Sequence, residues 1–115
     1  MAVNRRRGEV SAIIDGKERR LCLTLGALAE LEDAFAAGDL GALADRFRDG
    51  RLSARDLTRI IAAGLRGAGE AVSDADVAAM PIEGSAAGAA TIAVALLAAA
   101  FGSDEEAAGA GTANP

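Results

Sequence analysis

The segment 21–35, LCLTLGALAELEDAF, constrains the fold of this 115-residue chain more than any other, because it passes from strand-like to helical sequence. Upstream of it, Asp15-Gly16 lies between two β-prone runs. A two-residue hairpin turn needs positive φ at both positions, which Asp-Gly tolerates, so we expect a β-hairpin over residues 9–23. Thr24 is placed to cap the helix that follows. Two strands alone are marginally stable in water, so the hairpin must pack on helices.

Hydrophobic spacing predicts four to five short helices after the hairpin, at about residues 25–36, 39–48, 53–66, 73–80 and 85–101. Ser53 and Ser73 each precede an aspartate by three residues. This is the spacing of a capping box, so the two serines mark the starts of the third and fourth helices. We interpret Gly64, Gly67 and Gly69 as residues that loosen and end the third helix.

These elements predict an α+β, mostly helical fold, in which an N-terminal β-hairpin packs on four to five short helices. A chain of 115 residues is long enough for one domain. We expect that domain over residues 9–102, with a flexible N-terminus at 1–8 and a disordered acidic tail at 103–115.

The composition argues against an active site. The chain has no histidine, and therefore lacks the commonest general base and the commonest metal ligand. We expect no catalytic residue, no cofactor and no metal. The single cysteine, Cys22, cannot form an internal disulfide, which favours a reducing, cytoplasmic location. The basic N-terminal residues are not followed by an apolar stretch and do not form a secretory signal.

Charge is distributed unevenly along the chain. All 12 Lys and Arg lie at or before Arg66. The same stretch contains 10 acidic residues, so its net charge is +2. The remaining residues contain 7 acidic side chains and no basic one, so their net charge is −7. Such asymmetry suggests self-association or a charged partner. The overall net charge of −5 disfavours a dedicated nucleic-acid binder.

The last expected helix has no charged residue between Gly84 and Gly102. A helix without a polar face is normally buried on all sides or spans a membrane. This run is short for a bilayer, rich in alanine and lacks flanking Lys or Arg, so we expect no membrane span. Two alternatives remain, namely a central core helix and a face that docks a second copy or an unfolded apolar client. Its candidate partner-binding residues are Ile92, Leu96, Leu97 and Phe101.

A second candidate surface is an arginine stripe on the third helix, formed by Arg55, Arg59 and Arg66. The helical repeat places the three within about 40° of one another, away from the apolar side of the helix. They could dock an acidic partner or phosphates, or they could form an ordinary solvated face. The arginines at 5–7 could contact nucleic acid, although a solubilising role is the simpler interpretation.

Three segments, LTLGALAELEDAF, LSARDLTRIIAAGLRGAG and VSDADVAAM, resemble one family of phage-like proteins. These are the tail assembly chaperones encoded with gene transfer agents, the phage-derived particles that carry host DNA between bacteria. The family has also been described as tail tube proteins. The resemblance covers about residues 8–101 and contains no catalytic motif.

The resemblance implies a non-enzymatic role in tail assembly. A tail assembly chaperone would bind the tape measure protein, and other tail proteins, before the tail tube polymerises. It would keep that long helical chain soluble and be absent from the finished particle. Two alternatives are a structural component of the tail tube and a small nucleic-acid-associated regulator that uses the arginines.

Overall fold

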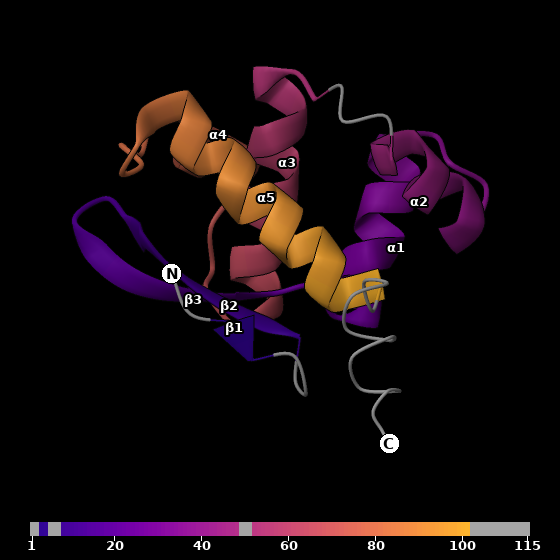
Figure 1. Cartoon of the computed structure of the whole chain (residues 1–115), viewed down its shortest axis with the longest axis horizontal. Helices are drawn as coiled ribbons and strands as arrows, with labels where there is room; N and C mark the ends of the chain where they lie inside the picture. Colours follow the sequence, from indigo (N-terminus) through magenta and orange to yellow (C-terminus); the bar gives the residue numbers. More distant parts are fainter. Residues whose placement is uncertain (1–2, 5–7, 49–51, 102–115) are drawn as a thin grey trace.

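The computed structural model describes residues 3–4, 8–48 and 52–101 (Figure 1). The α+β, mostly helical fold predicted from the sequence is confirmed. The elements, in chain order, are β1 (Val3–Asn4), β2 (Glu9–Ile14), β3 (Lys17–Cys22), α1 (Leu25–Ala34), α2 (Leu40–Arg48), α3 (Ala54–Gly67), α4 (Asp74–Ala78) and α5 (Ser85–Phe101). The arginines at 5–7 and the expected acidic tail at 103–115 lie outside the described residues.

The three strands form one antiparallel sheet in the order β1-β2-β3. β2 and β3 are joined by the expected turn, in which Asp15 and Gly16 have φ values of 56° and 76°. The short strand β1 pairs with the start of β2, although the sequence analysis placed its residues in a flexible N-terminus. Two residues are too few to show a strand periodicity, so hydrophobic patterning could not reveal β1.

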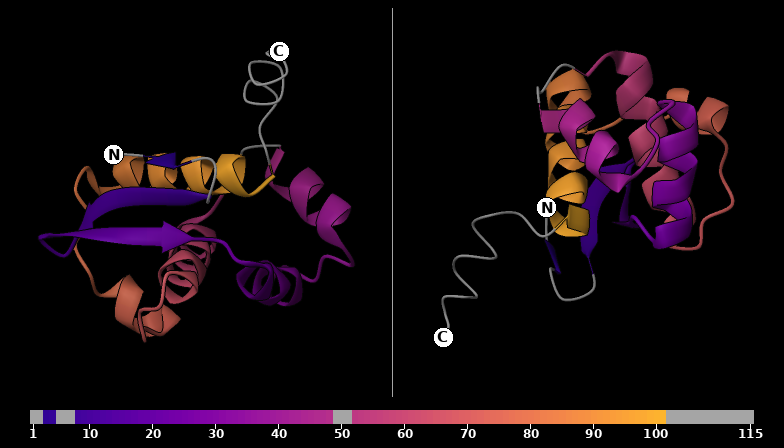
Figure 2. Two further views of the ribbon diagram at one scale, coloured as in Figure 1. Left: turned by 90° about the horizontal axis from the view of Figure 1, so that it is seen from below. Right: turned by 90° about the vertical axis from the view of Figure 1, so that its right-hand side faces the viewer.

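One face of the hairpin is buried and the other is open. Val10, Ala12 and Ile14 on β2 are buried together with Leu21 on β3, whose partner across the ladder is Val10. Figure 2 shows α5 lying close to the sheet along β2, and α3 lies against β3. The two long helices also contact each other, so the core lies between them and the buried face of the hairpin.

The helix starts follow the capping chemistry read from the sequence. Thr24 Oγ1 accepts a hydrogen bond of 3.0 Å from the backbone N–H of Ala27. Both predicted capping boxes are present, with Ser53 paired to Asp56 and Ser73 to Asp76. Such caps satisfy backbone N–H groups that have no partner within the helix. Local chemistry therefore fixed these starts.

Two glycines of α3 have a packing role that the sequence analysis missed. α3 continues through Gly64 and ends at Gly67, so Gly64 does not end the helix, whereas Gly67 lies at its end as expected. A Cβ at Gly64 would lie 2.9 Å from Leu96 Cδ1 and 3.2 Å from Leu21 Cβ. A Cβ at Gly67, where the helix ends, would overlap the carbonyl oxygen of Cys22. These glycines let α3 approach both β3 and α5.

Candidate functional site

The uncharged helix α5 has a buried side and an exposed side. Ile92 and Leu96, two of the predicted partner-binding residues, are 4% and 0% exposed and belong to the core. Leu97 and Phe101 are half-buried and pack against it. Ile92 and Leu96 therefore offer little surface to a partner in the native fold, whereas Leu97 and Phe101 remain partly accessible.

Val94 marks the exposed side of α5, with 61% of its surface accessible. A shallow hollow there is lined by Ala90, Thr91, Val94 and Ala95. We call these four residues the α5 face. At 100° per residue, Val94 lies about 160° around the helix from Ile92 and from Leu96, a signal that could have identified it.

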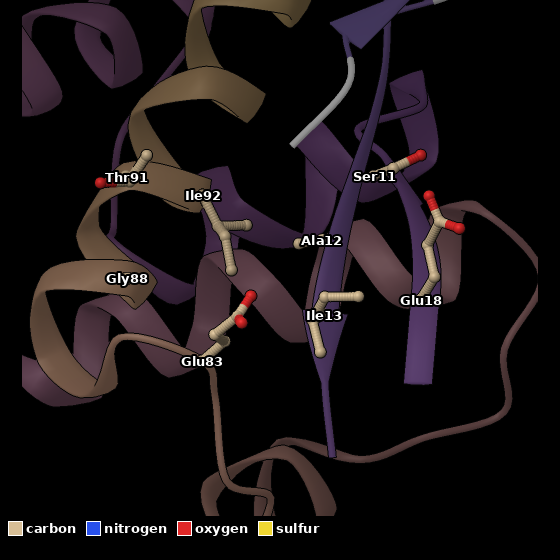
Figure 3. A pocket seen from close by; sticks show the side chains of 8 residues that line it. All are labelled: Ser11, Ala12, Ile13, Glu18, Glu83, Gly88, Thr91 and Ile92. Carbon is tan, nitrogen blue, oxygen red and sulfur yellow. The ribbon is translucent and has the colours of Figure 1, made fainter. Parts of the chain in front are cut away.

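A groove of about 450 Å³ lies beside the α5 face, between α5 and the edge of β2 (Figure 3). Figure 3 shows Ile92 reaching from α5 toward β2, with Glu83 between the two elements. Glu18 lies on the other side of β2. The groove is lined by Ser11, Ala12, Ile13, Glu18, Glu83, Gly88, Thr91 and Ile92.

Backbone pairing holds the connector before α5 against β2. Ile14 and Ile82 form an isolated antiparallel bridge, and the N–H of Asp15 donates to the carbonyl oxygen of Pro81 at 2.7 Å. The connector also lies close to α5, since a Cβ at Gly88 would overlap the carbonyl oxygen of Glu83. A glycine at the first turns of α5 therefore lets the connector approach closely, and this places Glu83 at the groove.

The arginine stripe is largely occupied by contacts within the chain. Arg66 donates to Glu30 Oε1 at 2.7 Å, to Asp74 Oδ1 at 3.2 Å and to the carbonyl oxygen of Val72 at 3.0 Å. The hydrogen bond to Glu30 is the main reason that the pKa of the Arg66 guanidinium is raised above its ordinary value. Arg66 thus joins α1, α3 and the start of α4.

The other two arginines of the stripe differ from each other. Arg59 lies over the Phe35 ring at 5.9 Å and donates to the carbonyl oxygen of Ala34 at 3.4 Å. Arg55 is exposed and forms no ion pair or hydrogen bond with the described part of the chain. Of the predicted stripe, only Arg55 is therefore fully available to a partner.

Neither a metal cluster nor a membrane span stands out in the ranges 3–4, 8–48 and 52–101. Within them, no group of three or more His, Cys, Asp or Glu is arranged to hold a metal ion. No helix there is both long enough and apolar enough to cross a bilayer.

A family model described as "phage tail tube protein, GTA-gp10" matches residues 7–103. The chain belongs to this family. The resemblance to gene transfer agent tail proteins is thus confirmed, and the description of the family indicates a tail protein. Comparisons with curated proteins and with solved structures give no match.

Proposed function

We propose that this tail protein acts as a chaperone that binds the tape measure protein during tail assembly, with the α5 face as its docking surface. The observation that carries the proposal is the exposed, uncharged side of α5. Four large hydrophobic side chains are exposed in the described part of the chain, and two of them, Val94 and Ile13, border this face or the adjoining groove. Exposed apolar surface of this kind commonly marks a binding site.

The α5 face suits a helical client. Alanine, threonine and valine side chains are short, so the backbone of a second helix can approach closely. An amphipathic helix buries its apolar side when it docks on such a surface. A long helical chain that exposes apolar stripes before it is enclosed in a tube would gain solubility from this contact. The lone cysteine is consistent with binding in the bacterial cytoplasm.

A structural role in the tail tube is the second candidate, and the description of the matching family favours it. A tube subunit must bind copies of itself through complementary surfaces, and the resulting contacts persist in the finished particle. A client-binding chaperone instead leaves before the particle is complete. The two roles therefore differ in where the protein is found.

Co-expression with the tape measure protein of the same gene cluster tests the proposal. Pull-down and light scattering should show a soluble complex that forms only when both proteins are present. Purified tails should lack this protein. If no complex forms and the protein is found in purified tails, the structural role replaces the chaperone role.

A matched pair of substitutions tests the docking surface itself. Val94→Asp places a charge on the α5 face and should abolish the complex. Leu25→Asp makes the same kind of change at the start of α1, where the leucine is 78% exposed, and should leave binding intact. Circular dichroism should show that both variants remain folded. Equal binding by the two variants would exclude the α5 face.

A further inference from the structure

We infer that the groove between α5 and β2 accepts a lysine or arginine side chain of the partner that docks on the α5 face. The partner segment is then an amphipathic helix with a basic residue beside its apolar stripe. This inference rests on the proposed function, because it assigns a chemistry to the same client.

The groove and the α5 face form one continuous surface. Thr91 lines both the shallow hollow around Val94 and the groove beside β2. The Thr91 hydroxyl donates to the carbonyl oxygen of Ala87 at 3.0 Å, so its one hydrogen-bond donor is directed back into the helix. A helix lying on the α5 face therefore has the groove within reach of a long side chain.

Among the described residues that line the groove, only Glu18 and Glu83 are charged, and both are acidic. Neither carboxylate has an ion pair or hydrogen bond with the described part of the chain. Other acidic side chains do form ion pairs, as Glu70 does with Arg19 at 2.6 Å and Glu30 with Arg66 at 2.7 Å. The groove thus carries two carboxylates that form no ion pair with a described residue, which favours a cationic partner group.

The walls of the groove match the stem of a basic side chain. Ala12, Ile13 and Ile92 provide apolar surface, and Gly88 leaves room beside the helix. Lysine and arginine lay their methylene groups along apolar surface while the charged head remains at a polar rim. As Figure 3 shows, Glu83 lies between α5 and β2, where such a head group would meet it first.

Substitutions that remove the two carboxylate charges test this inference. They are made in the full chain, and binding to the tape measure protein is measured. The double variant Glu18→Gln/Glu83→Gln should bind about tenfold more weakly at low salt, since two exposed carboxylates together contribute modestly to affinity. Its binding should also lose most of the salt dependence of the wild type. Asp33→Asn is a control for the loss of an acidic charge elsewhere, because it neutralises an exposed residue of α1 outside the groove.

The outcomes separate this inference from the proposed function. Weaker, salt-insensitive binding by the double variant, with unchanged binding by Asp33→Asn, supports a basic residue in the groove. Binding equal to wild type, while Val94→Asp still abolishes the complex, overturns the inference and leaves the docking surface in place. A wild-type chain that does not bind the tape measure protein at all overturns both.

Discussion

α3 and α5 both cover the buried face of the hairpin, but they differ in how they use the sides that turn away from it. Apart from Arg55, α3 places its charged residues against other parts of the chain. Arg66 reaches α1 and the start of α4, and Asp56 accepts from the backbone of Ser53 and lies 3.6 Å from Arg46 of α2. α5 has no charged residue and leaves Val94 exposed.

This difference shows that charged residues on a helix surface can be engaged by the rest of this small domain. The arginine stripe was a reasonable candidate because positive charge attracts acidic partners. Two of its three arginines are instead engaged within the fold, since Arg66 pairs with Glu30 of α1 and Asp74 of α4, and Arg59 contacts Ala34 and the Phe35 ring. The uncharged side of α5 has no such intramolecular use, and it therefore remains open.

The largest expected effect tests the close approach of α3 to the hairpin. Gly67→Ala would force its Cβ onto the carbonyl oxygen of Cys22, so it should lower the free energy of unfolding by more than about 3 kcal/mol. Gly38→Ala, which meets nothing within 4 Å, should change it by less than about 0.5 kcal/mol. Urea denaturation measures both. A Gly67→Ala protein as stable as the wild type would contradict the described α3–β3 contact.

The next prediction separates the two sides of α5. Leu96→Ala removes a fully buried side chain from the core and should cost about 2–4 kcal/mol of stability. Val94→Ala, on the exposed side, should change stability by less than about 0.5 kcal/mol. Thermal unfolding followed by circular dichroism measures both changes. Equal losses would mean that Val94 is also covered, which would remove the basis for the α5 face.

A smaller effect is expected within the arginine stripe. Arg66→Met keeps most of the apolar stem but removes hydrogen bonds to two carboxylates, and it should cost about 1 kcal/mol because the site is partly exposed. Arg55→Met should change stability by less than about 0.3 kcal/mol. Urea denaturation at low and high salt measures the difference. If the two variants lose the same stability, Arg66 does not join the helices as described.

The smallest effect concerns Cys22, the last residue of β3. Burial, and secondarily the charge of Glu9, raises the pKa of the Cys22 thiol above its ordinary value. The folded chain therefore holds this proton to higher pH than the unfolded chain. Its contribution to stability is complete below the unfolded pKa and is lost as the pH rises through the folded pKa.

Alkylation of Cys22 by iodoacetamide at pH 8 should accordingly be slower in the native protein than in urea, because only the thiolate reacts. Cys22→Ser should also lose less stability than the wild type between neutral and alkaline pH. Equal alkylation rates in native and denatured protein would show that the thiol is neither buried nor shifted.

Parts of the candidate site could be predicted and others could not. The sequence identified α5 as unusual because its lack of charge is visible without any structure. It assigned the partner-binding role to Ile92 and Leu96, which the fold places in the core. The groove was also missed, since its walls come from β2, β3, the connector and α5, and their meeting depends on the Ile14–Ile82 bridge.

The sequence by itself determined the features that depend on neighbouring residues. Asp15-Gly16 set the hairpin turn, Ser53 and Ser73 set two helix starts, and the matching family was already visible in short segments. Only the tertiary structure decided which sides of α3 and α5 are occupied. Burial and ion pairing are set by contacts between residues far apart in the chain, as between Arg66 and Glu30, and local patterns do not encode these distances.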